Sequence, residues 1–191
     1  IVPAIVDDVS ELYLFQRSAP WMLPAPTYHD RMSDGSDWLH SKVPGYGQLF
    51  RLWVTAGGIE GRLHIATAEK DWDGAPLSVS KANDEFRNKI IEEMRRQYAD
   101  RPDLLEKVIP QYPPSAKRML RDNGVWARAL MSPQTEVIST GVDSFTPTEI
   151  VTGDGRHLEV DVVIYATGFR PSDYLDPLQI VGRNGVEIHD Y

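Results

Sequence analysis

The sequence predicts an α/β fold that contains part of a parallel sheet, a β-hairpin and a mostly helical insertion. An apolar run at residues 12–17 (LYLFQR) is typical of a strand buried in a parallel sheet. Residues 83–100 carry an apolar stripe at helical spacing, which predicts an amphipathic helix. Alternating segments on both sides of Gly153-Asp154-Gly155 indicate a hairpin. Helical and strand patterns thus occur together in one chain.

Composition indicates a chain that folds around a hydrophobic core. Of its 191 residues, 41% are hydrophobic and 25% are charged, which are ordinary values for globular proteins. The lack of cysteine excludes disulfides, thiolate metal sites and a cysteine nucleophile, and it fits a reducing cytoplasm. No apolar run approaches the roughly 20 residues that span a bilayer, so we expect a cytoplasmic protein without a membrane partner. The chain begins with Ile1 inside a helical pattern, and we expect it to be an internal fragment.

Charge is distributed unevenly along the chain. The net charge is −8, yet residues 87–128 hold ten Lys and Arg against six Asp and Glu. A basic stretch within an acidic chain argues against a general nucleic-acid-binding protein and is compatible with a local anionic ligand. A solvated helix face is the simpler explanation for most of these charges.

The first third of the chain predicts a helix end, a strand and then two further helices. Residues 1–10 have apolar side chains at helical spacing, and the strand at 12–17 follows. The stretch SAPWMLPAP holds three prolines in nine residues and must be extended or turned. Residues 36–60 predict two helices separated at Pro44-Gly45, and residues 61–81 are rich in turns.

The clearest helix spans residues 83–100, and Asn83 is expected to be its N-cap. Its apolar stripe is expected to pack in the core, and it consists of Phe86, Ile90, Ile91, Met94 and Tyr98.

Strands are predicted to dominate the last third of the chain. A proline-rich loop (YPPSAKRML) leads to a short helix around residues 123–131. We expect strands at 135–138, 144–151 and 157–169. Within the last of these, VDVVIYA is apolar nearly throughout, so it is expected to be buried on both faces, as in a parallel α/β sheet.

Three sites could carry chemistry, and the first is the end of the strand at 12–17. In a dinucleotide-binding fold the second strand ends beside the adenosine ribose, where an acidic residue favours NAD and an arginine favours the 2′-phosphate of NADP. Here the strand ends in Gln16-Arg17-Ser18, and a guanidinium with a hydroxyl suits a phosphate. The alternative is a surface arginine at a strand end.

The second site is the pair Lys117 and Arg118, which follows two prolines. Adjacent cations there could bind a phosphate or stabilise negative charge on a reduced flavin, or they could be an exposed basic pair. The third is the sequence from Asp161 to Phe169, in which a strand ends in small residues that let a cofactor approach the backbone. An ordinary strand followed by a turn is the alternative.

In combination these segments resemble the middle of Baeyer–Villiger monooxygenases, within the flavin-containing monooxygenase superfamily. The similar phrases are LYLFQRSAPWMLP, PDLLEKVIPQYPPSAKRMLRDNG and VDVVIYATGF. HSKVPGYGQLFRLWV and LQIVGRNGVEIHDY are most similar to the 4-hydroxyacetophenone monooxygenase branch. The resemblance implies a partial Rossmann-like NADPH-binding domain in an enzyme that uses FAD, NADPH and O2 to convert an aryl ketone into an ester.

The resemblance also implies a role for individual residues. Gln16, Arg17 and Ser18 would bind NADPH, with Arg17 and Ser18 on its 2′-phosphate, and Lys117 would close on the same group. Arg118 would be the catalytic arginine near the flavin. Ala166-Thr167-Gly168 would join the NADPH and FAD regions. Family members often have Thr in place of Ser18 and Cys or Gly in place of Ala116, but neither difference removes a cation.

The implied domain organisation divides the chain into four parts. Residues 1–29 and 111–170 would belong to the NADPH-binding domain, residues 30–110 to a helical insertion, and residues 171–191 to the segment that returns to the FAD domain. The chain contains no G-x-G-x-x-G loop, so this fragment alone is expected neither to retain FAD nor to turn over. No histidine spacing predicts a metal site, and no G-x-S-x-G elbow predicts a hydrolase.

Two alternatives to ketone oxidation remain open on the sequence. One is a related flavin monooxygenase that oxidises nitrogen or sulfur. The other is a non-catalytic α/β binding module that kept only the fold.

Overall fold

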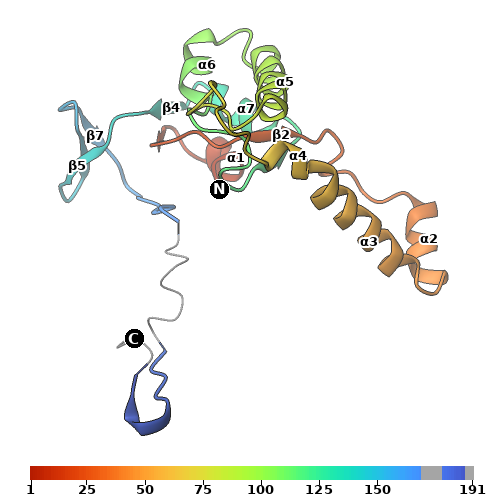
Figure 1. The fold of residues 1–191 in the computed structure, drawn as a ribbon. Coiled ribbons are helices and arrows are strands. Elements are labelled where there is room, and N and C mark those ends of the chain that lie inside the picture. The colour runs from red at the N-terminus through yellow and green to blue at the C-terminus, as the bar shows by residue number, and fades with distance from the viewer. Residues whose placement is uncertain (169–177, 188–191) are drawn as a thin grey trace.

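The computed structural model of the chain describes residues 1–168 and 178–187 and has a mixed α/β architecture (Figure 1). The α-helices are α1 (Val2–Ile5), α2 (Asp34–Lys42), α3 (Tyr46–Ile59), α4 (Leu63–Ala66), α5 (Lys81–Gln97), α6 (Pro102–Val108) and α7 (Val125–Met131). The strands are β1 (Leu12–Phe15), β2 (Met22–Pro24), β3 (Leu120–Asp122), β4 (Thr135–Ile138), β5 (Val142–Phe145), β6 (Glu149–Thr152) and β7 (His157–Glu159). Short 3-10 helices are η1 (Val6–Asp8), η2 (Glu60–Arg62) and η4 (Arg183–Gly185). No described helix is both long and apolar enough to cross a membrane.

Two parallel strand pairs bring distant parts of the chain together. β1 pairs with β4, with Leu12 opposite Thr135, and β2 pairs with β3, with Met22 opposite Leu120. The parallel strand predicted at residues 12–17 is therefore confirmed, although only Leu12 in β1 is fully buried. Because β2 and β3 come from opposite halves of the chain, the loop after β1 lies next to the loop before β3.

One hydrophobic core lies between the β1–β4 pair and helices α1, α5, α6 and α7 (Figure 1). The predicted stripe of α5 packs into it: Ile90, Ile91, Met94 and Tyr98 are buried and Phe86 is partly buried. Burial raises the pKa of Tyr98, so its phenol stays protonated at working pH. The helix at 83–100 and its packing role are thus confirmed.

The N-cap of α5 is Ser80, so the prediction that Asn83 caps this helix is wrong. The Ser80 hydroxyl accepts a hydrogen bond from the backbone amide of Asn83 at 3.1 Å. Asn83 lies one turn inside and is fully buried, where its amide donates to the carbonyl oxygens of Ile65 and Pro114 at 2.9 and 3.0 Å. Serine and asparagine are both common N-caps. Here the side chain of Asn83 is used in hydrogen bonds to carbonyls from distant segments, and Ser80 is the cap.

The predicted hairpin is confirmed and is larger than expected. β6 and β7 are antiparallel and joined through residues 153–156, where Gly155 has a φ of 83°. The single strand predicted at 144–151 is wrong, because a turn divides it into β5 and β6. Thr146 closes that turn: its amide donates to the carbonyl of Glu149, and its hydroxyl accepts from the Glu149 amide, both at 2.9 Å. The result is a three-stranded antiparallel sheet.

The strand predicted within VDVVIYA is not formed, and its side chains are exposed rather than buried. Residues 160–168 pair with no described strand, and the exposed fractions of Val162 and Tyr165 are 75% and 70%. A doubly buried strand requires neighbours on both edges and both faces, and the described chain supplies neither. The accessible surface of 14263 Å² also exceeds the about 9200 Å² that a compact chain of this mass leaves exposed.

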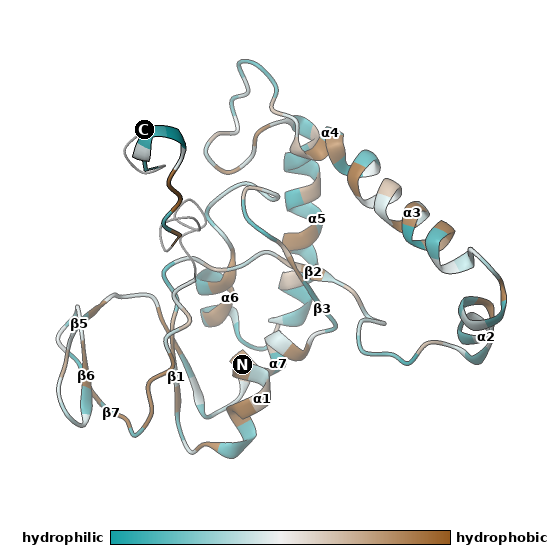
Figure 2. Ribbon diagram, turned by 90° about the horizontal axis from the view of Figure 1, so that it is seen from below, coloured by the Kyte–Doolittle hydropathy of each residue, from teal (hydrophilic) through white to brown (hydrophobic). Residues whose placement is uncertain are grey.

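Helices α2 and α3 form an arm that projects from the core (Figures 1 and 2). The predicted break between them is confirmed, and Gly45 begins α3 with a φ of 77°, a conformation that glycine adopts without strain. Leu49, Leu52 and Trp53 of α3 are exposed, and no residue of α3 is buried. The apolar surface of this arm is thus uncovered within the described residues.

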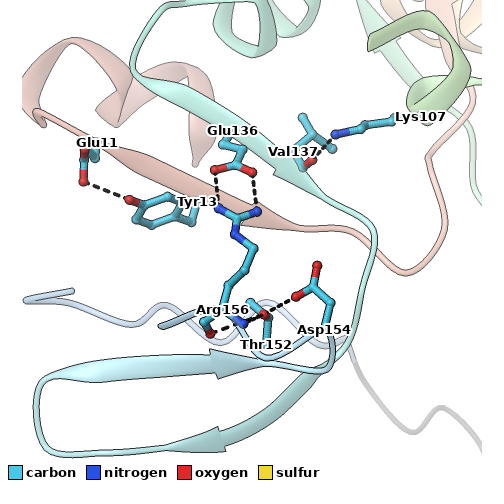
Figure 3. A network of polar contacts seen from close by, with 8 residues as sticks. All are labelled: Glu11, Tyr13, Lys107, Glu136, Val137, Thr152, Asp154 and Arg156. Carbon is cyan, nitrogen blue, oxygen red and sulfur yellow. Dashed lines mark hydrogen bonds and ion pairs between the residues drawn. The ribbon is translucent and has the colours of Figure 1, made fainter. Parts of the chain in front are cut away.

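An ion pair attaches the antiparallel sheet to β4 (Figure 3). Arg156, which lies between β6 and β7, donates two hydrogen bonds to the carboxylate of Glu136 at 2.6 and 2.9 Å. These bonds lower the pKa of Glu136. Thr152 and Asp154 hold the turn that carries Arg156, and a hydroxyl–carboxylate bond joins them.

Glu136→Gln is expected to loosen this attachment and to remove its pH dependence. The pKa of Glu136 is lower in the folded than in the unfolded chain. The ion pair therefore stabilises the fold above the unfolded pKa, about 4.3, and this stabilisation is lost as pH falls through the folded pKa. Both side chains are over one third exposed, so the effect on stability is at most about 1 kcal/mol. Hydrogen exchange of β6 and β7 amides from pH 7 to pH 3 measures it, with Glu159→Gln, which changes an exposed carboxylate on β7, as a control. Equal acid sensitivity in Glu136→Gln and the parent would contradict this role.

Candidate anion-binding site at the β1 end and the proline-rich loop

The loop after β1 and the proline-rich loop before β3 are in direct contact. The ammonium of Lys117 donates a hydrogen bond to the hydroxyl of Ser18 at 2.9 Å, across 99 positions of sequence. The contact depends on the parallel pairing of β2 with β3, which aligns the segments that precede these strands. Two of the predicted site residues, from separate motifs, are thus brought together.

Tyr112 and Trp21 hold the two loops in place. The Trp21 indole donates to the carbonyl of Tyr112 at 3.0 Å, and the Tyr112 hydroxyl donates to the carbonyl of Ala19 at 2.9 Å. The Trp21 side chain is 0% exposed, and its ring meets that of Tyr112 edge to face. Sequence reasoning missed Tyr112, although an aromatic residue directly before Pro113-Pro114 was an available signal.

Tyr112 also positions the cation. The ammonium of Lys117 lies 4.5 Å from the centre of the Tyr112 ring, a distance typical of a cation–π contact. Burial raises the pKa of Tyr112, so its hydroxyl remains a hydrogen-bond donor at working pH. Lys117 is therefore oriented by the ring below it and by Ser18 beside it.

The proline-rich loop has a defined turn ahead of the two cations. The amide of Ala116 donates to the carbonyl of Pro113 at 3.2 Å, and Ser115 has a φ of 72°. Proline followed by a residue with positive φ is the pattern of a type II turn. Pro114 is buried and accepts the bond from Asn83, so the turn is anchored to α5.

Gln16 has a structural role in extending β1. Its amide donates to the carbonyl of Ile138 at 2.9 Å, which continues the ladder with β4. Its side chain donates to the carbonyl of Lys107 at 3.2 Å, and the ammonium of Lys107 donates to the carbonyl of Val137 at 2.9 Å. α6 is thereby tied to the ends of β1 and β4, beside the loop that carries Arg17.

Arg17 and Arg118 are exposed, and no ion pair holds either guanidinium within residues 1–168 and 178–187. Guanidinium groups, like the ammonium of Lys117 and the hydroxyl of Ser18, are donors that bind phosphate or carboxylate groups. The contact that the structure shows among these four side chains is the bond between Ser18 and Lys117. The described residues contain no cluster of side chains suited to a metal ion.

Ala166-Thr167-Gly168 does not join this cluster in the structure. The three residues are exposed, and no hydrogen bond joins them to Ser18 or Lys117 among the described residues. Gly168 has a φ of 92°, which suits a turn. Phe169, the last residue of the predicted motif, lies outside the described residues.

Comparison with models of known protein families finds no match to this chain. Curated relatives do match over nearly its whole length. The monooxygenase y4iD of Sinorhizobium fredii is 36% identical over 195 residues, which cover 100% of this chain and 28% of the relative. A Baeyer–Villiger monooxygenase of Pseudomonas aeruginosa is 30% identical over 192 residues, covering 99% and 33%. The chain therefore spans about a third of the length of the curated relatives that it matches.

Solved structures with similar folds include a steroid monooxygenase. Oxidized steroid monooxygenase bound to NADP matches with a TM-score of 0.72 and 25% identity, over 97% of this chain and 40% of the neighbour. The OTEMO complex with FAD and NADP matches with a TM-score of 0.71 and 23% identity, over 100% and 39%. These similarities confirm the α/β fold class.

Proposed function

We infer that the chain belongs to the Baeyer–Villiger and FAD-binding monooxygenases, and we propose that it carries the site for the NADPH 2′-phosphate in such an enzyme. The relatives that share its full length support the family, and structure neighbours are complexes with NADP or with FAD and NADP. The observation that carries the proposal is the 2.9 Å bond between Lys117 and Ser18, the residue that follows Arg17 in the sequence.

The side chains at this site fit a phosphate monoester. Arg17 offers a planar fork, Lys117 a point charge and Ser18 a hydroxyl, and such charge-assisted bonds are among the strong ones in proteins. The described residues supply no carboxylate partner to Arg17 that would compete with a ligand. Gln16 supports the site by fixing the strand end that presents Arg17.

We propose that residues 1–29 and 111–170 form the nucleotide-binding part, that residues 30–110 are an insertion in it, and that residues 171–191 return to an FAD domain. The helices found between residues 34 and 108 support a mostly helical insertion. α5 and α6 at its end share the core with α1 and α7, so this part of the insertion is integral to the fold. Ala166-Thr167-Gly168 would link the two cofactor regions.

Arg118 is the residue that we assign to the oxidation step. FAD, when bound, supplies the redox chemistry with O2. Arg118 is exposed and follows Lys117 in the sequence, and its guanidinium would provide positive charge where negative charge develops. The described residues offer no glycine-rich loop for a flavin, and we propose that the chain alone does not retain FAD.

The substrate that we propose is an aryl ketone, which becomes an ester. The sequence similarity of HSKVPGYGQLFRLWV and LQIVGRNGVEIHDY to the 4-hydroxyacetophenone monooxygenase branch supports this choice. Oxidation at nitrogen or sulfur of an amine or thioether is the alternative, and the Arg118 experiment in the Discussion includes a comparison of the two substrate types.

Arg17→Ala and Lys117→Gln are each expected to raise the KM for NADPH about tenfold in the enzyme that carries this chain, because each removes a charge-assisted bond to the 2′-phosphate. The KM for NADH should change little, since NADH lacks that phosphate. Steady-state kinetics with both nucleotides measures the ratio of the KM for NADPH to the KM for NADH. Arg95→Gln, on an exposed face of α5, is the matched control. Equal losses with NADPH and NADH would contradict the assignment.

A further inference from the structure

A second basic site lies on the side of β2 and β3 that α5 covers. Figure 2 shows α5 beside these two strands, and residues of α5 and β2 contact each other. A hollow of about 490 Å³ opens there. Three exposed cations and three less exposed apolar side chains are among the residues that line it. The cations are Arg62, Lys89 and Arg121, and the apolar side chains are Leu23, Phe86 and Ile90.

The fold places these side chains on one surface for simple geometric reasons. Leu23 and Arg121 are opposite each other in the β2–β3 pair. Alternation along β3 turns the next residue, Asp122, to the other face, where it is buried and its carboxylate accepts hydrogen bonds from the amides of Gly124 and Trp126. On α5, Lys89 and Ile90 follow Phe86 by three and four positions, so the three share one helical face.

Among the described residues, no acidic side chain pairs with any of the three cations. No acidic side chain lines the hollow, and no hydrogen bond or ion pair holds the side chain of Arg62, Lys89 or Arg121 in the part of the chain that the structure describes. Like charges that share a hollow repel one another, and an anion between them relieves that repulsion. Lys89 and Arg121 come from the basic stretch at residues 87–128, so part of that stretch is gathered at a site.

We propose that this hollow binds a small organic anion that joins a phosphate or carboxylate to an apolar body. Arginine forks bind such groups through two parallel bonds, and the lysine adds a point charge. Leu23, Phe86 and Ile90 would contact the apolar body, and the volume lies in the range of small-molecule sites. None of the three cations is Arg17, Lys117 or Arg118, so the site is separate from the proposed nucleotide site.

Phenyl phosphate is the probe that tests the proposal, by calorimetric titration of the 191-residue chain. Saturable binding that depends on Lys89 and Arg121 is expected. At this hollow, phenol and inorganic phosphate should each bind much more weakly because each lacks half of the recognised group. Lys89→Gln and Arg121→Gln should each weaken binding about tenfold. All of these side chains are exposed, so the variants are expected to keep the parent circular dichroism spectrum.

Two control variants separate this site from others. Arg95→Gln changes an exposed cation on the same helix outside the hollow and should leave binding unchanged. Lys117→Gln should remove only binding at the separate Ser18–Lys117 site and should leave the binding that depends on Lys89 and Arg121. Loss of phenyl phosphate binding in Lys117→Gln but not in Arg121→Gln would place the anion at the Ser18–Lys117 site and overturn the proposal. Absence of saturable binding, or equal binding of phenol, would overturn it as well.

Discussion

Arg118→Ala is expected to reduce ester formation by about 10²- to 10³-fold in the enzyme that carries this chain, while flavin reduction by NADPH continues at nearly the parent rate. The guanidinium is assigned to stabilise negative charge during oxidation of the ketone, and the nucleotide site is assigned to Arg17, Ser18 and Lys117. Stopped-flow reduction of the flavin without O2, followed by product analysis with an aryl ketone, measures the two steps separately.

Two comparisons make the Arg118 result specific. Arg118→Lys keeps a positive charge but loses the planar fork, so it should retain more ester formation than Arg118→Ala. Arg17→Ala should show the opposite pattern. Flavin reduction should be slower at a low NADPH concentration, while the yield of ester per reduced flavin should be normal. The same defect in both alanine variants would show that the division of roles is wrong. Oxidation of an amine but not of a ketone by the parent would favour the alternative substrate class.

Trp21→Ala is expected to destabilise the chain by about 3–5 kcal/mol, the cost typical of deleting a fully buried large aromatic side chain. The Trp21 side chain is 0% exposed, and its indole donates to the carbonyl of Tyr112. The change therefore leaves a cavity and frees the proline-rich loop. Because domains are stable by only about 5–15 kcal/mol in total, much of the chain should be unfolded in mild denaturant. Urea unfolding followed by circular dichroism measures the loss.

Trp53→Ala is the matched control for this prediction. Trp53 lies on α3 and is 72% exposed, so its removal should change the free energy of unfolding by less than about 0.5 kcal/mol. If the two tryptophan variants unfolded at the same urea concentration, Trp21 would not be the anchor of the two loops.

Local patterns predicted most of the helices and several of the strands. The stripe of α5 is a property of spacing, and the break at Pro44-Gly45 follows from proline and glycine chemistry, so both were visible without coordinates. The N-cap of α5 could not be predicted in this way, because Ser80 and Asn83 are both good caps. Only the carbonyls of Ile65 and Pro114, which come from other parts of the chain, draw Asn83 into the interior.

The segment VDVVIYA shows where pattern reasoning fails. An apolar run indicates that a segment can be buried, but burial also requires neighbouring strands and helices, which the run itself does not specify. Here the hairpin ends at β7, and the described chain offers no strand beside residues 160–168, so Val162 and Tyr165 stay exposed. The apolar surface of α3 is uncovered for the same reason.

The sequence by itself determined which side chains could bind an anion, because charge and hydrogen-bonding capacity belong to each residue wherever it lies. It also determined the local turns and helices that present them. Only the tertiary structure decided that Ser18 meets Lys117, that Tyr112 supports both, and that Lys89 and Arg121 share a hollow. These pairings follow from parallel strand pairs and core packing between distant segments, and contacts of that kind depend on the whole chain.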